Sequence, residues 1–135
     1  SYSHKDGSFA AELATARTFC QLRDVELMQN AGLALGGSLN NAIVVDNGKI
    51  LNDGGLRIER EFVRHKVLDC LGDLFLIGVP VKAKMTASRP GHALSTELVQ
   101  TLLNDPTAYK VIEAGSEHSR SDSFAMPEFA AAAMA

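Results

Sequence analysis

A histidine and two carboxylates stand at four-residue steps in one stretch of the chain: His65, Asp69 and Asp73. In a helix that turns about 100° per residue, Asp69 lies about 40° and Asp73 about 80° round the axis from His65, so all three share one stripe. An imidazole and a carboxylate can bind one zinc ion together. The same spacing also occurs on solvated helix faces, and two ligands do not complete a site, so the spacing alone leaves the metal interpretation open. The apolar residues of this stretch fall on the other side of the helix, where a core would sit: Val63, Val67, Cys70, Leu71 and Leu74.

Length and composition indicate a soluble globular protein. A chain of 135 residues has the length of one domain, and its 46% hydrophobic and 21% charged residues are ordinary for such a protein. The net charge of −3 argues against a nucleic-acid partner. We expect a cytoplasmic protein, because the sequence has no secretory signal pattern and no transmembrane segment. Cys20 and Cys70 form no CxxC motif, and Cys70 is expected to be a buried, reduced thiol.

The first half of the chain alternates between strand and helix patterns. Residues 8–19 predict a strand, and Leu22–Asn30 predicts a short helix that stops at Gly32. Residues 42–51 predict a β-hairpin, because the pair Asn47-Gly48 tolerates the positive φ angles of a type I′ turn.

The second half predicts a long helix over residues 59–77, a strand over residues 79–87, a turn at residues 88–91 and a last helix that stops near Pro106. The fold class is therefore α+β: a small β-sheet with helices packed on one face, a two-layer sandwich with a βαβ-type insert.

The composition changes after about residue 114. Residues 1–114 are expected to form the domain, and residues 115–135, which are polar and then alanine-rich, a loosely ordered tail. Three hydrophobic residues of the tail could dock on the domain: Phe124, Met126 and Phe129.

Four segments occur in an order and at separations that match a known family. They are Arg17-Thr18-Phe19, residues 33–46, residues 61–74 and residues 91–94. Together they closely resemble the C-terminal half of the zinc-dependent UDP-3-O-acyl-N-acetylglucosamine deacetylase of lipid A biosynthesis in Gram-negative bacteria. The resemblance covers about residues 7–109. It implies a metalloamidase that removes the N-acetyl group from UDP-3-O-(3-hydroxyacyl)-N-acetylglucosamine, a committed step of lipopolysaccharide biosynthesis.

The resemblance implies roles for the acidic and histidine residues. His65 and Asp69 match two of the three protein ligands of a zinc ion that keeps an open position for water. His92 matches a cationic histidine that stabilises charge on the attacked carbonyl and can protonate the leaving amine. Asp73 would orient that histidine and favour its charged form. Each residue also has a plainer interpretation. His65 could be a core or surface histidine, and Asp69 a solvated carboxylate. His92 could be only the start of a helix, and Asp73 a buried polar residue bound to a backbone N–H.

The resemblance also implies substrate contacts. Thr18 matches a hydroxyl that faces the tetrahedral intermediate, and Phe19 matches a ring that packs on the sugar. Lys66 and Arg89 match positions near the pyrophosphate, although the family often has lysine where Arg89 stands. Without the resemblance, Thr18 and Phe19 could be ordinary residues at the end of a strand. Lys66 and Arg89 could be solvated basic side chains. Three residues match the region of the acyl-chain passage, and could equally belong to a core: Val25, Ala34 and Ser38.

One part of the family pattern is absent from these 135 residues. The family's third zinc histidine and its catalytic glutamate are adjacent, as Glu-His, in an N-terminal half. The pair Glu117-His118 is followed by polar residues rather than by an apolar helical run, and His4 has no matching context either. We therefore expect the chain to need the N-terminal half as a partner, and to be inactive alone.

Two other classes of protein stay open. One is a metal-binding or regulatory module without catalysis, and the other is a structural or interaction domain that reuses the fold. The presence of His92, Asp73 and Thr18 argues against both, because a binding module needs no group that stabilises an oxyanion.

Overall fold

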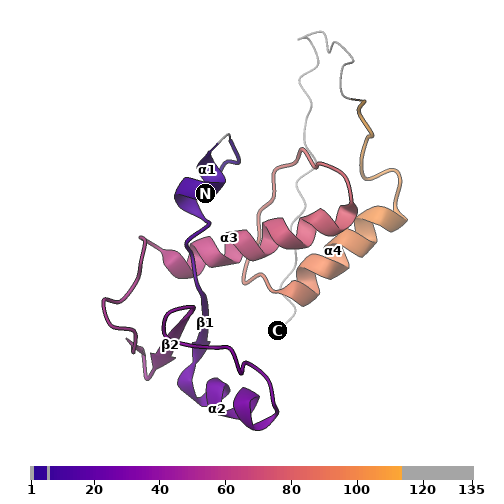
Figure 1. Cartoon of the computed structure of the whole chain (residues 1–135). Helices are drawn as coiled ribbons and strands as arrows, with labels where there is room; N and C mark the ends of the chain where they lie inside the picture. The colour runs from indigo at the N-terminus through magenta and orange to yellow at the C-terminus, as the bar shows by residue number, and fades with distance from the viewer. Residues whose placement is uncertain (1, 6, 114–135) are drawn as a thin grey trace. The chain divides into compact units, whose positions relative to one another are not determined.

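The computed structural model describes residues 2–5 and 7–113 of the chain (Figure 1). The chain divides into two compact units, Ser1–Leu68 and Asp69–Ala135. A three-stranded mixed sheet and several helices make the fold α+β, as predicted. The elements in chain order are α1 (Ser8–Glu12), β1 (Thr18–Gln21), α2 (Leu22–Asn30), β2 (Ala42–Asp46), β3 (Lys49–Ile50), α3 (Glu61–Leu74), the 3-10 helix η1 (Phe75–Ile77) and α4 (His92–Asn104).

The sheet of the first unit has the strand order β1-β2-β3. β1 pairs with β2 in parallel, with Thr18 opposite Ala42 and Gln21 opposite Val45. Two parallel strands need a crossover connection between them. Helix α2 lies in that connection and contacts both strands, so the predicted βαβ unit is confirmed.

Helix α2 ends where the sequence predicts. Gly32 follows it with φ +74°, and the N–H of Leu33 donates to the carbonyl of Met28 at 2.7 Å. The N–H of Gly32 donates to the carbonyl of Gln29 at 2.9 Å. These two bonds form a Schellman motif, which satisfies carbonyls that the last helical turn leaves without partners.

The predicted hairpin is also confirmed. β2 and β3 are antiparallel, with Asp46 opposite Lys49, and the turn residues Asn47 and Gly48 have φ angles of 47° and 78°. Two positive φ angles in a two-residue loop define a type I′ turn, whose twist matches that of the strands. The hairpin places Ile43, which is fully buried, in the core of the first unit.

The strand predicted over residues 8–19 is wrong. Its first part is helix α1, and only Thr18 onwards joins the sheet. Phe9 and Leu13 are four residues apart, a spacing that fits one helical face as well as one strand face. The N–H of Leu13 donates to the carbonyl of Phe9 at 2.9 Å, and Leu13 is buried. The alanines between them favour the helix.

The second unit contains the end of α3, then η1 and α4, and α4 packs against η1. The long helix predicted over residues 59–77 is confirmed. Its α-helical part is α3, from Glu61 to Leu74, and the remaining residues before Gly78 form the 3-10 helix η1. α4 is confirmed, and so is the buried thiol of Cys70.

The strand predicted over residues 79–87 is wrong, since every one of these residues is exposed and none belongs to a strand. A run of β-branched residues forms a strand only when another strand supplies the paired N–H and carbonyl groups. Pro80 also removes one donor that such a ladder would use.

Several expectations fall on residues that the structure does not describe. The predicted tail of residues 115–135 lies there, including the docking residues and the pair Glu117-His118. The domain boundary at residue 114 therefore stays a prediction. None of the described helices is long and apolar enough to span a membrane.

Candidate metal site and active site

Strand β1 and helix α3 bring three of the predicted site residues together in the first unit. The ring of Phe19 meets the imidazole of His65 edge to face, with centroids 6.1 Å apart and an interplanar angle of 75°. Phe62 packs on the same ring at 4.9 Å and 84°. The Nζ atom of Lys66 lies 5.5 Å from the centroid of Phe19. Edge-to-face packing and the ammonium over the ring fix Phe19 against α3.

The imidazole of His65 is oriented by backbone. Its Nδ1 lies 3.3 Å from the carbonyl oxygen of Ala16. In the tautomer with its hydrogen on Nδ1, the imidazole donates this hydrogen to the carbonyl, and the lone pair is then on Nε2. Histidines that bind metals have this arrangement, in which the second nitrogen is held by a carbonyl or a carboxylate. His65 therefore fits a zinc ligand through Nε2.

Asp69 stands one helical turn after His65 and is half-buried. Its carboxylate oxygen and the imidazole nitrogen are both suitable zinc donors. Within the described residues, no group of three or more His, Cys, Asp or Glu side chains comes together that could hold a metal. The part of the chain that the structure describes thus supplies two suitable donors on one helix.

Asp73 and His92 meet in the second unit. His92 is the first residue of α4, and its Nδ1 lies 3.0 Å from each carboxylate oxygen of Asp73. The side chain of Asp73 is 15% exposed and that of His92 is 69% exposed. The carboxylate is thus fixed while most of the imidazole faces outward. This contact is what an orienting role of Asp73 requires.

The remaining polar and basic positions lie apart in the sequence. Thr18 is exposed at the first position of β1, next to Phe19. Arg89 is exposed in the second unit, before Pro90, and has a left-handed backbone with φ 51°. Lys66 belongs to the first unit. Their proposed contacts with substrate stay predictions.

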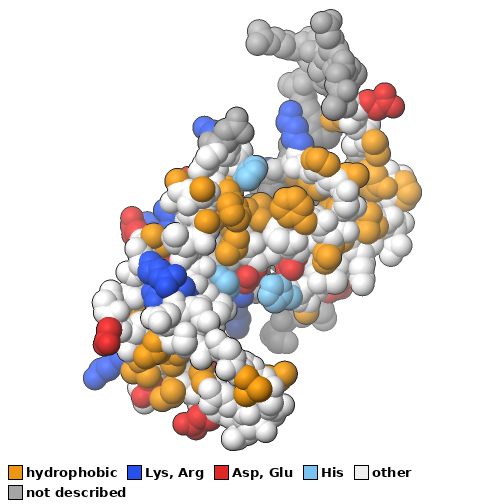
Figure 2. All heavy atoms as spheres, viewed as in Figure 1, with side chains coloured by type: hydrophobic (Ala, Val, Ile, Leu, Met, Phe, Trp, Pro, Cys, Tyr) orange, Lys and Arg blue, Asp and Glu red, His pale blue; other side chains and the backbone are white. Residues whose placement is uncertain are grey.

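The residues predicted for the acyl-chain passage belong to the crossover between β1 and β2. Val25 is half-buried on α2, whereas Ala34 and Ser38 are exposed in the loop that leads to β2. Hydrophobic side chains reach the surface of the molecule in several places, as the orange spheres in Figure 2 show. Four leucines of the crossover are among the exposed ones: Leu27, Leu33, Leu35 and Leu39.

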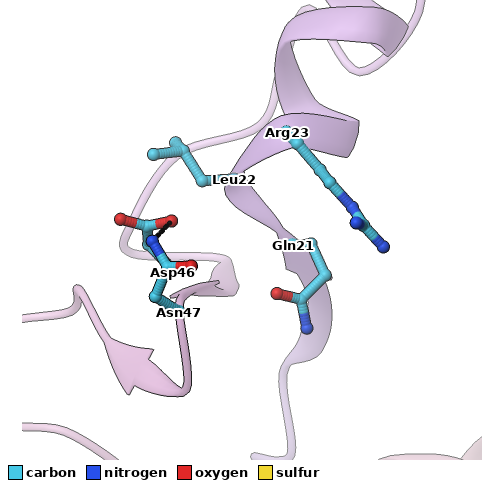
Figure 3. Close-up of a pocket in the computed structure, with 5 residues that line it drawn as sticks. All are labelled: Gln21, Leu22, Arg23, Asp46 and Asn47. Carbon is cyan, nitrogen blue, oxygen red and sulfur yellow. Dashed lines mark hydrogen bonds between the residues drawn. The ribbon is translucent and has the colours of Figure 1, made fainter.

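A pocket lies at the ends of β1 and β2, where α2 and the hairpin turn begin (Figure 3). The side chain of Asn47 donates to Asp46 at 3.1 Å beside it. None of the residues predicted for the site lines this pocket, so it adds nothing to the metal interpretation. The lining residues are Gln21, Leu22, Arg23, Asp46 and Asn47.

A buried ion pair, to which the sequence alone assigns no role, lies beside the site. The Nε of Arg17 donates to Oε1 of Glu61 at 2.9 Å, and its Nη2 donates to Oε2 at 3.1 Å. The hydrogen bond from Arg17 holds the pKa of Glu61 at about 2, well below its ordinary value. One feature of the sequence pointed to this pair. Arg17 and Glu61 have opposite charges and lie in two of the segments that match the family, Arg17 directly before Thr18 and Glu61 four residues before His65.

Comparison with known proteins agrees with the resemblance. The family described as LpxC: UDP-3-O-acyl N-acetylglycosamine deacetylase matches residues 1–104. The chain is 54% identical over 112 residues to the UDP-3-O-acyl-N-acetylglucosamine deacetylase of Anaeromyxobacter sp. (strain Fw109-5), which covers 83% of this chain and 37% of that protein. It is 54% identical over 109 residues to the enzyme of the same name from Myxococcus xanthus (strain DK1622), covering 81% of this chain and 35% of that protein.

A third relative comes from a different genus. The chain is 50% identical over 105 residues to the UDP-3-O-acyl-N-acetylglucosamine deacetylase of Psychrobacter arcticus (strain DSM 17307 / VKM B-2377 / 273-4), covering 78% of this chain and 33% of that protein. The chain thus spans about a third of the length of the curated relatives it matches. By the match over residues 1–104 and these identities, the chain belongs to the LpxC family.

Proposed function

We propose that the chain is the C-terminal part of a zinc-dependent amidase that removes the N-acetyl group from UDP-3-O-(3-hydroxyacyl)-N-acetylglucosamine. The observation that carries this proposal is the family match over residues 1–104, because this range contains every residue to which we assign a role. The named relatives are deacetylases of this substrate class. The cytoplasm is the compartment we propose for the reaction.

His65 and Asp69 are the proposed metal ligands in this chain. Zinc in such a site would polarise the acetamide carbonyl and lower the pKa of a water molecule. The contact of the His65 Nδ1 with the Ala16 carbonyl supports this role, because it leaves Nε2 as the metal-binding nitrogen. The third ligand and the general base are proposed to come from an N-terminal half, as the family's Glu-His pair.

His92 is proposed to stabilise the charge that develops on the attacked carbonyl oxygen and to donate a proton to the leaving amine. The 3.0 Å contacts with the carboxylate of Asp73 support this role, because they hold the ring by Nδ1 and direct Nε2 away from the carboxylate. The hydroxyl of Thr18 is proposed to donate a hydrogen bond to the same intermediate.

The remaining roles concern binding. The ring of Phe19 is proposed to pack on the sugar, and Lys66 and Arg89 to neutralise the pyrophosphate. Val25, Ala34 and Ser38 are proposed to line the passage for the acyl chain. The exposed leucines of the same crossover support this, because an acyl tail needs an apolar surface.

The proposal is tested by assaying deacetylation of a UDP-3-O-acyl-N-acetylglucosamine with added zinc. The 135-residue chain alone, shown to be folded by circular dichroism, is expected to give no turnover, because it lacks a general base in the family's motif. Joining it to an N-terminal half that carries the Glu-His pair, here called the complete enzyme, should restore turnover.

Two results would contradict the proposal. Turnover by the chain alone that is lost in Glu117→Ala would make the pair Glu117-His118 catalytic. Zinc binding without any turnover in the complete enzyme would instead indicate a metal-binding module.

A further inference from the structure

The Arg17–Glu61 pair is the centre of a buried polar network in the first unit. Arg17 is 7% exposed and Glu61 is fully buried. The guanidinium donates to the carbonyl of Gly55 at 2.8 Å and to that of Leu39 at 3.4 Å, in addition to its two bonds with Glu61. The backbone N–H of Arg17 donates to Oε1 of Glu61 at 3.0 Å, and that of Arg57 donates to Oε2 at 2.6 Å. One carboxylate thus receives both the backbone and the side chain of Arg17.

Asn52 extends this network to the second strand of the sheet. Its side-chain oxygen accepts the N–H of Val44 at 2.9 Å. Its side-chain nitrogen donates to the carbonyls of Leu39 and Ala42, both at 2.7 Å. Among the described residues, every buried side-chain nitrogen or oxygen has a hydrogen-bond partner. The carbonyl of Leu39, which also accepts from Arg17, therefore belongs to a network whose side chains are all satisfied.

The two members of the pair stand beside proposed site residues on two elements. Arg17 is covalently joined to Thr18, the first residue of β1, and Glu61 begins α3 one turn before His65. Their contact joins residues 44 positions apart in the sequence. Because the bond from the Arg17 backbone fixes the main chain and not only a side chain, it sets the position of β1 relative to the first turns of α3.

We propose that the Arg17–Glu61 pair is a positioning device that holds the start of β1 against the first turns of α3. Its catalytic consequence rests on the proposed function, in which Thr18 and Phe19 must stand beside the metal ligand His65. A buried ion pair adds little stability compared with hydrophobic residues of the same volume. Its directional, charge-assisted bonds are suited to fixing geometry instead.

The test compares Glu61→Gln and Arg17→Lys in the complete enzyme with a matched control, Glu12→Gln. Glu12 also pairs with an arginine of α3, Arg64, at 3.2 Å, but its side chain is 43% exposed. Three properties are measured in folded, zinc-loaded protein. They are the kcat for deacetylation, the zinc content, and the nuclear Overhauser effect between the ring protons of Phe19 and His65.

Both test variants should weaken the Phe19–His65 effect and lower kcat by about 10- to 100-fold, because a displacement of about 1 Å costs that much in rate. Their zinc content should not change, and Glu12→Gln should match the wild type in all three properties. Arg17→Lys keeps the charge but not the forked donors, so it decides the matter if Glu61→Gln does not fold.

Folded variants that keep the Phe19–His65 effect and the wild-type kcat would overturn the proposal, even if they unfold at a lower temperature. The ring-to-ring measurement does not depend on deacetylation. If the complete enzyme has no deacetylase activity, the proposed function fails, and the ring contact still decides whether the pair positions β1.

Discussion

His65 and His92 each direct Nδ1 at an oxygen atom, and the two oxygens differ in charge. His65 meets the neutral backbone carbonyl of Ala16, whereas His92 meets the carboxylate of Asp73. A carbonyl partner suits a neutral imidazole that binds a metal, and a carboxylate partner suits an imidazole that carries a proton to the leaving group. The different partners therefore fit the different roles that we propose for the two rings.

Removing the charge from Asp73 should affect catalysis and leave the metal in place. We expect Asp73→Asn to lower kcat of the complete enzyme by about 10- to 100-fold, since groups that orient a functional histidine have effects of this size. Zinc content, measured by atomic absorption, should equal that of the wild type. Glu97→Gln, a carboxylate-to-amide change at an exposed position of α4, serves as the control and should have no effect. Loss of zinc from Asp73→Asn would show that Asp73 belongs to the metal site instead.

At the scale of the elements, the sequence predicted the structure well where residues within one segment determine its conformation. The turn at Asn47-Gly48 and the end of α2 at Gly32 follow from which residues tolerate a positive φ angle. The placement of His65, Asp69 and Asp73 on one face follows from the helical repeat of α3 alone. For this reason both the hairpin and the shared face of these three residues could be predicted from the sequence.

Most of the features that the sequence did not predict depend on partners distant in the sequence. Residues 79–87 contain the β-branched Val79, Val81 and Thr86, but strands form only where another chain segment completes the ladder. Phe9 and Leu13 fit a helical and a strand face equally, and the structure has the helical turn, in which the N–H of Leu13 donates to the carbonyl of Phe9. The Arg17–Glu61 bond joins positions 44 residues apart, and no local periodicity reports such a contact.

The Arg17–Glu61 pair should make the free energy of unfolding depend on pH. The pKa of Glu61 is lowered from 4.5 to about 2 in the folded chain, mainly by the hydrogen bond from Arg17. A lowered pKa means that the carboxylate stabilises the folded state fully above about pH 5 and ceases to do so as the pH falls towards 2. This lowering of the Glu61 pKa corresponds to about 3 kcal/mol of stability of the folded state near neutral pH, compared with a carboxyl group of unchanged pKa.

Urea unfolding of the wild type and of Glu61→Gln at several pH values measures this contribution. We expect the wild type to be more stable at about pH 6, and the difference to shrink by about 2 kcal/mol at about pH 3. If the two proteins lose stability in parallel over this range, the carboxylate of Glu61 does not have the pKa that its contacts imply.

At the scale of the whole molecule, the chain spans about a third of its relatives, and the proposed roles are divided accordingly. The chain offers two suitable metal donors on α3 and a histidine held by a carboxylate at the start of α4. A catalytic zinc in a protein normally has three protein ligands and one open position. The central claim is therefore that His65 binds a zinc ion on which deacetylation by the complete enzyme depends.

The measurement that tests this claim most directly is the zinc content and turnover of the complete enzyme with His65→Ala, compared with His4→Ala. Both variants replace a histidine by alanine in the first unit, but His4 is exposed and its ring lies against Tyr2, near the start of the chain. We predict that His65→Ala loses most of its bound zinc and its turnover, and that His4→Ala keeps both. A His65→Ala enzyme that retains stoichiometric zinc and wild-type turnover would contradict the account.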